Sequence, residues 1–156
     1  MQIELARGVD APIIAVLSRD LIETGLGWSW RPERVLRAIR DRDTTVIKFV
    51  EHDRISGFAI MRFGYEEAHL DLLAVRAGRR RRGIGSALLR WLEQSALTAG
   101  TSIVRLEVRE SSLGAQRFYE RMGYRPYRTV TGYYRGREAA VQMARDLWCD
   151  LPISAT

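Results

Sequence analysis

LDLLAVRAGRRRRGIGSALLRWLEQSA, residues 70–96, joins a strand-like segment to a helix-like segment through an arginine-rich loop that ends in two spaced glycines, Gly83 and Gly85. The part that ends at Val75 completes AHLDLLAV, residues 68–75, which we expect to be a strand. Beyond the glycines, apolar residues recur at the spacing of one helical face, at Ile84, Ala87, Leu88, Trp91, Leu92 and Ala96. The stretch therefore predicts a strand, a basic loop and an amphipathic helix, a unit typical of α/β domains.

The loop has the features of an anion-binding site. The first amides of a helix have no acceptors within the helix, and the helix dipole favours negative charge there. Glycine lets the backbone approach phosphate oxygens closely, and arginine adds charge-assisted hydrogen bonds. Neither a P-loop nor a dinucleotide fingerprint fits, and the pattern present is R-x-x-G-x-G at Arg80, Gly83 and Gly85. We expect a phosphate or pyrophosphate ligand; the alternative is a solvated basic turn.

The composition is that of a globular domain. A chain of 156 residues, 46% of them apolar, can bury a core, so we expect one domain over residues 1–156. The net charge of +6 falls to +2 without the four arginines 79–82, because 21 basic residues then face 19 acidic ones. Such a local excess disfavours a general nucleic-acid surface. No apolar run approaches the roughly 20 residues that span a bilayer, so we expect a cytoplasmic protein without membrane contact.

Metal chemistry is not indicated by the residues that usually bind metals. The chain has one cysteine, Cys149, and two histidines, His52 and His69, without the spacing of a zinc site. We therefore expect no metal.

Hydrophobic periodicity and turn residues predict the remaining elements. Helices are expected from Asp10 to a break at 25–33, from Pro32 to about Arg40, from near Gly83 to a stop at Gly100, and at 113–122 before Gly123. Strands are expected at 3–7, 44–52, 55–63, 68–75, 102–109, 125–134 and 138–147, with turns at 53–54 and 135–136. This order predicts an α/β domain with a mixed sheet.

Two residues beyond the loop are candidates for acid–base chemistry. Glu107 lies in the middle of an apolar strand, where a carboxylate is uncommon unless it is paired or functional. The alternative is a solvent-facing residue paired with Arg105 and Arg109 on the same face. Tyr119 lies on the next helix, where the alternative is packing in the core.

The opening stretch and LEVRESSLGAQRFYERMGYR, residues 106–125, together resemble the GNAT superfamily of acetyl-CoA-dependent N-acetyltransferases. The resemblance covers about residues 55–147. With GYYRGREAAVQMARDL, residues 132–147, the motifs are most similar to RimI-type enzymes, which acetylate the N-terminal amine of a ribosomal protein. The resemblance implies a single-domain fold with a mixed, mostly antiparallel seven-stranded sheet flanked by about four helices, and acetyl-CoA as cosubstrate.

The resemblance also implies roles for individual residues. Glu107 matches the general base and Tyr119 the general acid. Acetyl-CoA is expected to bind at the end of the strand, along the loop and at the start of the helix: Leu73, Ala74, Val75, Arg80, Arg81, Arg82, Gly83, Ile84, Gly85 and Ser86. Ser112 stands where the family usually has an asparagine that contacts the cofactor, so it is also expected to lie near acetyl-CoA. Arg80 is the motif position, whereas the neighbouring arginines 79, 81 and 82 lend backbone amides or diffuse charge. Tyr133 and Tyr134 match a pair near the acceptor.

The aromatic residues of the N-terminal third extend the candidate acceptor site. Trp28 and Trp30 are candidates to line it, and the alternative is that their loop packs onto the sheet.

These residue types suit direct acetyl transfer to an amine. An α-amine titrates at about 8 and a lysine at about 10.4, so a base must remove a proton before the amine attacks the thioester. The amide of Val75 is a candidate to stabilise the oxyanion, and Tyr119 to protonate the departing thiolate. Alternative sources of the base are carboxylates and a histidine in or before the strand at 68–75: Glu66, Glu67, His69 and Asp71.

The expected acceptor is a protein or peptide N-terminal amine. The alternative acceptor is a small amine such as a polyamine, an amino acid or an aminoglycoside, and a less favoured class is a nucleic-acid-binding module. We expect a monomer or a homodimer.

Overall fold

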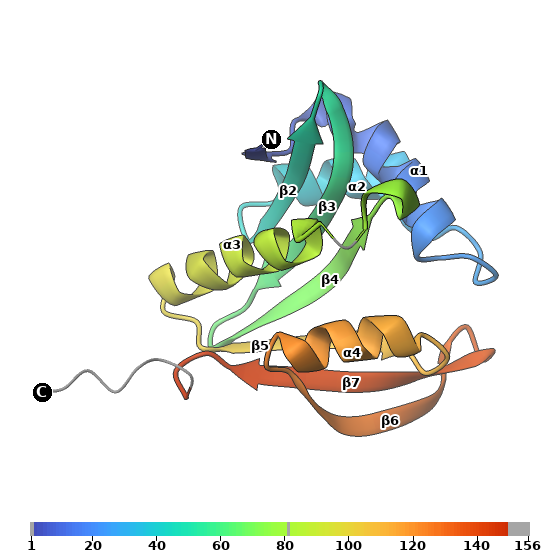
Figure 1. Cartoon of the computed structure of the whole chain (residues 1–156), viewed down its shortest axis with the longest axis vertical. Helices are drawn as coiled ribbons and strands as arrows, with labels where there is room; N and C mark the ends of the chain where they lie inside the picture. Colours follow the sequence, from blue (N-terminus) through green and yellow to red (C-terminus); the bar gives the residue numbers. More distant parts are fainter. Residues whose placement is uncertain (1, 81, 150–156) are drawn as a thin grey trace, which may run out of the picture. The chain divides into compact units, whose positions relative to one another are not determined.

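The computed structural model describes residues 2–80 and 82–149. Within these residues, strands and helices follow one another as the sequence pattern predicts (Figure 1). They are β1 (Gln2–Leu5), α1 (Ala11–Leu21), α2 (Pro32–Arg40), β2 (Thr44–Glu51), β3 (Arg54–Phe63), β4 (Glu67–Val75), α3 (Ile84–Thr98), β5 (Ile103–Arg109), α4 (Leu113–Arg121), β6 (Arg125–Tyr134) and β7 (Glu138–Asp146). Two 3₁₀ turns, η1 (Gly8–Asp10) and η2 (Ala77–Arg79), precede α1 and follow β4.

The strands form a seven-stranded sheet in the order β1-β2-β3-β4-β5-β7-β6, and the pairs β1–β2, β2–β3, β5–β7 and β6–β7 are antiparallel. This confirms the predicted fold class. The chain divides into two compact units, Met1–Arg62 with Leu70–Leu92 and Phe63–His69 with Glu93–Thr156, and both contribute strands. The expectation of a single domain over residues 1–156 stays a prediction.

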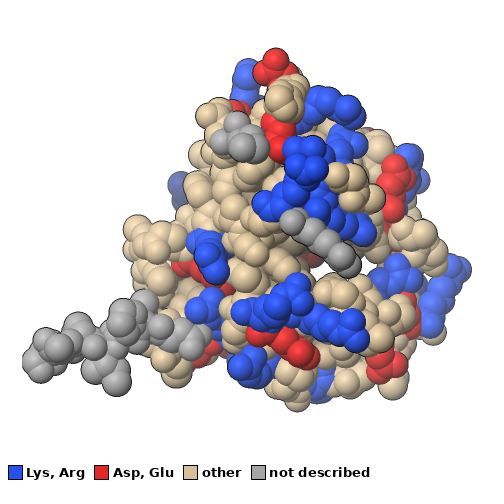
Figure 2. Space-filling view, viewed as in Figure 1, with Lys and Arg blue, Asp and Glu red and all other residues tan. Residues whose placement is uncertain are grey.

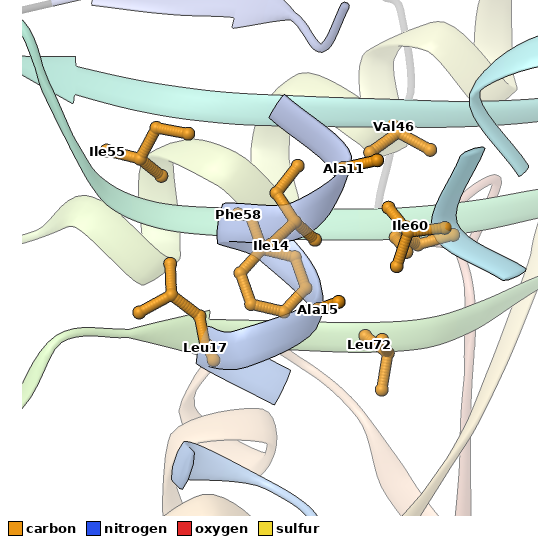
Figure 3. Close-up of a cluster of buried hydrophobic side chains, with 11 residues drawn as sticks. Ala11, Ile14, Ala15, Leu17, Val46, Ile55, Phe58, Ile60 and Leu72 are labelled. Atoms are coloured by element: carbon orange, nitrogen blue, oxygen red, sulfur yellow. The ribbon is translucent and has the colours of Figure 1, made fainter. Parts of the chain in front are cut away.

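The core of the first unit forms where α1 and α2 pack on β2, β3 and β4 (Figure 3). Ile14 of α1, Val35 of α2 and Phe58 of β3 are fully buried in it. Burial of each such side chain contributes about 1.5–3 kcal/mol to the free energy of unfolding. On β3, Gly57 leaves space for Ile84 and Leu88 from the start of α3. This packing fixes the end of β4 and the beginning of α3.

In the second unit, β5 pairs with β7 and β7 with β6. Along β5, burial alternates so that Val104, Leu106 and Val108 are buried, whereas the residues between them are partly exposed. The register places Glu107 directly opposite Gln142 of β7. The polar face of β5 therefore presents Glu107 toward neighbouring polar side chains instead of the apolar core.

Glycines end or turn several elements where a left-handed backbone is needed. Gly100 follows α3 with φ of +83° and Gly123 follows α4 with φ of +96°, as the sequence predicts. The β2–β3 turn, predicted at 53–54, is instead formed by His52 and Asp53 with positive φ, and β3 starts at Arg54. Aspartate and histidine tolerate this conformation better than most residues, which explains the shift by one position.

Among residues 2–80 and 82–149, no helix has the length and apolar character needed to cross a membrane.

Candidate active site

The predicted cofactor residues of the first unit form a strand end, a loop and a helix start. Leu73, Ala74 and Val75 end β4, while Ile84, Gly85 and Ser86 form the first turn of α3. Gly83 precedes that turn with φ of +77°, and its carbonyl accepts the amide of Ala87 at 3.0 Å. The amides of the first turn have no acceptor within the helix, so the loop ends at a helix N-terminus suited to an anion. Arg81 lies outside the described residues.

The arginines around this loop do not share one role. Arg76 Nε donates to the carbonyl of Ile55 at 2.6 Å. Arg79 Nε donates to Oε1 of the buried Glu51 at 2.9 Å, and its Nη2 donates to the other carboxylate oxygen. The expectation that Arg79 lends backbone amides or diffuse charge is therefore wrong, because its side chain joins the loop to the end of β2.

Arg80, the motif position, differs from Arg79. It is exposed, and its Nε donates to the carbonyl of Val75 at 3.2 Å. Arg82 is also exposed. Lys and Arg atoms gather over the β4–α3 connection (Figure 2), so the loop carries a positive surface although Arg76 and Arg79 serve as internal anchors.

In the second unit, three strands supply donors to the Glu107 carboxylate. His69 Nε2 of β4 lies 2.6 Å from Oε1, and Tyr133 Oη of β6 donates to the same oxygen at 3.2 Å. Gln142 Nε2 of β7 donates to Oε2 at 3.3 Å. The Glu107 side chain is only 10% exposed. A polar cluster thus surrounds a nearly buried carboxylate in the middle of a strand.

The cluster determines the protonation state of Glu107. Burial raises the pKa of its carboxyl, but the hydrogen bond and charge of His69 and the hydrogen bonds of Tyr133 and Gln142 outweigh burial. The pKa of Glu107 therefore lies below its ordinary value, and the carboxylate is ionised at neutral pH. An ionised carboxylate can accept a proton, which is what a general base requires.

The alternative, in which the neighbouring arginines of β5 neutralise Glu107, does not match the contacts. Arg105 Nε donates to Glu67 at 2.7 Å, and Arg109 Nε donates to Glu138 at 2.6 Å. Each arginine on the polar face of β5 thus has a carboxylate partner other than Glu107.

The other candidate bases of β4 have different surroundings. Asp71 accepts a hydrogen bond from Arg62 at 2.6 Å, and Glu67 is paired with Arg105. Glu66 is exposed, before the first residue of the strand. His69 is the member of this group that contacts Glu107. The sequence indicates His69 as a possible base but not as a partner of Glu107, because no local pattern predicts the pairing of these two residues.

Tyr119, the predicted general acid, lies on the buried side of α4. Its ring contacts Phe118 at a centroid distance of 5.0 Å and Tyr124 at 5.8 Å, both edge to face. Burial raises the pKa of Tyr119 well above its ordinary value, so the phenol keeps its proton at neutral pH. Ser112 is the residue before α4, and its backbone carbonyl accepts the amide of Gln116 at 3.1 Å.

The tyrosine pair predicted near the acceptor belongs in part to the Glu107 cluster. Tyr133 is 45% exposed and donates to Glu107, while Tyr134 is half-buried. The two rings meet edge to face at 4.9 Å. An exposed tyrosine that contacts the carboxylate gives the cluster a solvent-facing side.

Trp28 and Trp30 lie in the loop between α1 and α2 and pack against the core of the first unit. Trp28 Nε1 donates to the carbonyl of Ala15 at 3.1 Å. The buried Glu23 accepts hydrogen bonds from the amides of Ser29 and Trp30, which fixes the loop. The loop therefore packs against α1 and the core of the first unit, while its packing onto the sheet and the acceptor role of these tryptophans both stay predictions.

Comparison with known proteins places the chain in a family. The sequence pattern of the acetyltransferase (GNAT) family matches residues 15–124. The chain belongs to the GNAT family of acetyltransferases. The residues matched include the β4–α3 loop, Glu107 and Tyr119, so the family assignment rests on the same segments as the candidate site.

Two curated relatives of this GNAT protein are N-acetyltransferases by name. The ribosomal protein bS18-alanine N-acetyltransferase of Salmonella typhimurium is 36% identical over 111 residues, which are 69% of this chain and 71% of the relative. An uncharacterised N-acetyltransferase of Methanocaldococcus jannaschii is 38% identical over 93 residues, 59% of this chain and 60% of the relative. The chain is therefore an N-acetyltransferase, although the second match spans less than two thirds of that relative.

A solved structure agrees with the fold. The crystal structure of the ribosomal-protein-S18-alanine N-acetyltransferase from Escherichia coli superimposes with a TM-score of 0.80 and 26% identity, covering 94% of this chain and 93% of that one. Within the described part of this chain, no group of three or more His, Cys, Asp or Glu side chains could hold a metal ion.

Proposed function

We propose that this GNAT protein transfers the acetyl group of acetyl-CoA directly to the N-terminal amine of a protein or peptide. The observation that carries the proposal is the ionised, nearly buried Glu107 carboxylate beside the exposed Tyr133. Similarity to the bS18-alanine N-acetyltransferases supports an N-terminal amine as the acceptor. Small amines are the alternative class of acceptor, and the test below compares them with peptides.

The proposed reaction assigns each candidate residue a chemical task. The amides at the start of α3 and the guanidinium group of Arg80 bind the pyrophosphate of acetyl-CoA, and the exposed Arg82 adds diffuse positive charge. The neutral fraction of the substrate amine attacks the thioester carbon, and Glu107, directly or through water, accepts a proton from the nitrogen as the new bond forms. The amide of Val75 stabilises the oxyanion, and Tyr119 gives its proton to the departing CoA thiolate. Because donor and acceptor bind together, no covalent enzyme intermediate is needed.

The timing of the proton transfer to Glu107 follows from the pKa values of the two groups. An α-amine titrates at about 8, well above a carboxylate whose pKa is lowered, so the transfer is uphill in the resting site. Attack on the thioester makes the nitrogen more acidic as its lone pair forms the new bond, and the proton is then transferred readily to an ionised carboxylate. Glu107 is therefore suited to act as a base while the amine attacks the thioester, and not to remove the proton before attack.

The test compares acceptors and variants in one assay. With acetyl-CoA, we expect acetylation of peptides with a free N-terminus and none of N-terminally blocked, lysine-free peptides. Glu107→Gln and Tyr119→Phe should each lower kcat by about 100-fold or more with little change in acetyl-CoA affinity. The matched control is Glu110→Gln, which removes an exposed carboxylate just beyond β5 and should leave kcat unchanged.

Three outcomes would contradict parts of this proposal. Turnover of polyamines, amino acids or aminoglycosides in preference to peptides would replace the acceptor class. Full activity of Glu107→Gln would remove Glu107 as the base. Absence of thermal stabilisation by acetyl-CoA, which should reach about 2.7 kcal/mol at 100-fold its Kd, would contradict binding of the donor.

A further inference from the structure

The contact between His69 and Glu107 extends the function proposed above and rests on it. Their Nε2 and Oε1 atoms are 2.6 Å apart, the shortest of the three distances that join a donor to this carboxylate. An ionised carboxylate has only acceptor sites, so Nε2 must carry the proton in this contact. We propose that His69 is a positioning residue for acetyl transfer, which orients the Glu107 carboxylate by donating its Nε2–H to Oε1.

The other two donors hold the carboxylate less firmly. Tyr133 is 45% exposed and its oxygen lies 3.2 Å from Oε1. Gln142 lies 3.3 Å from Oε2, and its own amide oxygen accepts Arg128 Nε at 2.7 Å. A short hydrogen bond from an imidazole that is 29% exposed restrains a side-chain torsion more than either of these longer ones. His69 thus accounts for most of the fixed orientation of Glu107.

The charged side chains of the surrounding strands bind partners other than Glu107, and His69 is the nearest donor to its carboxylate. On β4, Glu67 pairs with Arg105 of β5, and on β7, Glu138 pairs with Arg109 of β5. Arg128 of β6 contacts Gln142 instead of the carboxylate. His69 and Tyr133 are titratable groups that contact Glu107 directly. Tyr134 is a further titratable neighbour, because the charge of Glu107 contributes to raising its pKa.

Loss of His69 has two distinct consequences. Without the donor, the carboxylate can rotate away from the position in which it meets the attacking amine nitrogen, so kcat falls while acetyl-CoA affinity does not. The same change removes an interaction that favours the ionised form, so the pKa of Glu107 rises. A larger fraction of Glu107 is then protonated at a given pH, and the acidic limb of the kcat/KM profile moves to higher pH.

The experiment uses two substitutions of different chemistry in the full-length chain. His69→Leu removes the donor, whereas glutamine in His69→Gln can place an Nε2–H near the same point without titrating. We expect His69→Leu to lower kcat on the order of tenfold to 100-fold and His69→Gln to recover most of that loss. The control is His52→Asn, which removes the other histidine at an exposed turn position that asparagine tolerates.

The readouts separate positioning from a merely structural role. KM for acetyl-CoA and the unfolding temperature should stay near those of the parent chain, while the acidic limb of His69→Leu moves upward in pH. Equal kcat and equal pH profiles for His69→Leu and the parent would overturn the proposal, as would a His69→Gln variant no more active than His69→Leu.

A direct measurement covers the case in which His69→Leu does not fold. The chain contains two histidines, so the imidazole NMR signals of the parent chain and of Glu107→Gln can be assigned with His52→Asn. The signal of His69 should titrate differently once the Glu107 carboxylate is removed, and unchanged titration would overturn the contact. If instead Glu107→Gln keeps full activity, the proposed base fails whatever His69 does, so the two failures are distinguishable.

Discussion

Glu51 is a buried carboxylate held by two donors in the first unit. Arg79 donates to both of its oxygens, and Ser56 Oγ donates to Oε1 at 2.6 Å. The hydrogen bond of Arg79, with that of Ser56, lowers the pKa of Glu51 to about 2. A glutamate in an unfolded chain titrates at about 4.3. The pair therefore stabilises the fold above that pH, and its contribution is lost as the pH falls toward about 2.

This linkage gives a prediction for Glu51→Gln. At pH 7 the variant should unfold at a lower urea concentration than the parent chain, because the neutral amide of the buried glutamine cannot form an ion pair with Arg79. The difference should shrink as the pH falls from about 4.3 toward about 2, because over this range the unfolded parent takes up a proton at Glu51 while the folded parent keeps the carboxylate ionised. Urea unfolding at a series of pH values measures the gap, with Glu110→Gln as the exposed control. A gap that stays constant down to about pH 2 would contradict the role of the charge.

At the scale of elements, β3 lies close to β4 and α3 at Gly57. A Cβ atom there would lie 3.0 Å from the carbonyl oxygen of Ala74 on β4, and 3.2 and 3.3 Å from Ile84 and Leu88 of α3. Side chains of α3 can shift by a few tenths of an ångström, but the backbone of β4 is held within the sheet. Glycine at this position thus allows the strand end and the helix start, both predicted to bind acetyl-CoA, to keep their positions.

We therefore predict that Gly57→Ala weakens acetyl-CoA binding. The added methyl group should displace the end of β4 or the first turn of α3 and raise the Kd for acetyl-CoA by roughly tenfold, with a lower unfolding temperature. Calorimetric titration and thermal unfolding measure the two effects. Gly114→Ala is the control, because a Cβ at that helical position meets no atom within 4 Å and should leave binding unchanged. Parent-like affinity in Gly57→Ala would contradict the packing argument.

The helices and strands could be predicted from the sequence because their signals are local. Pro32 and Arg40 bound α2 as expected, and Gly100 and Gly123 follow their helices with positive φ. Hydrophobic periodicity indicates the buried face of a single helix or strand, whatever other element packs against it. The β2–β3 turn lies one residue before its predicted position, because positive φ at His52 leaves little trace in the sequence.

At the scale of the whole molecule, contacts between elements could not be predicted in the same way. The pairing of Glu107 with His69 depends on how two strands 38 positions apart in the sequence align, and a shift of one residue would turn either side chain to the other face. Likewise, Arg79 looks like any arginine of a basic run until the fold brings Glu51 to it. The strand pattern and the family resemblance both indicate Glu107 as a candidate, and the resemblance implies a role for Tyr119, but neither predicts the partners of these residues.

The two edge strands of the sheet argue that the molecule is a monomer. β1 has only four residues, and β6 contains Pro126, which offers no N–H, and two register irregularities. Short edges, proline and bulges are features that discourage pairing with another sheet, and a net charge of +6 adds repulsion between copies. We predict that light scattering gives the mass of one chain over a wide range of protein concentration. Pro126→Val should restore a donor and increase self-association at high concentration, whereas a parent chain with the mass of two chains would contradict the prediction.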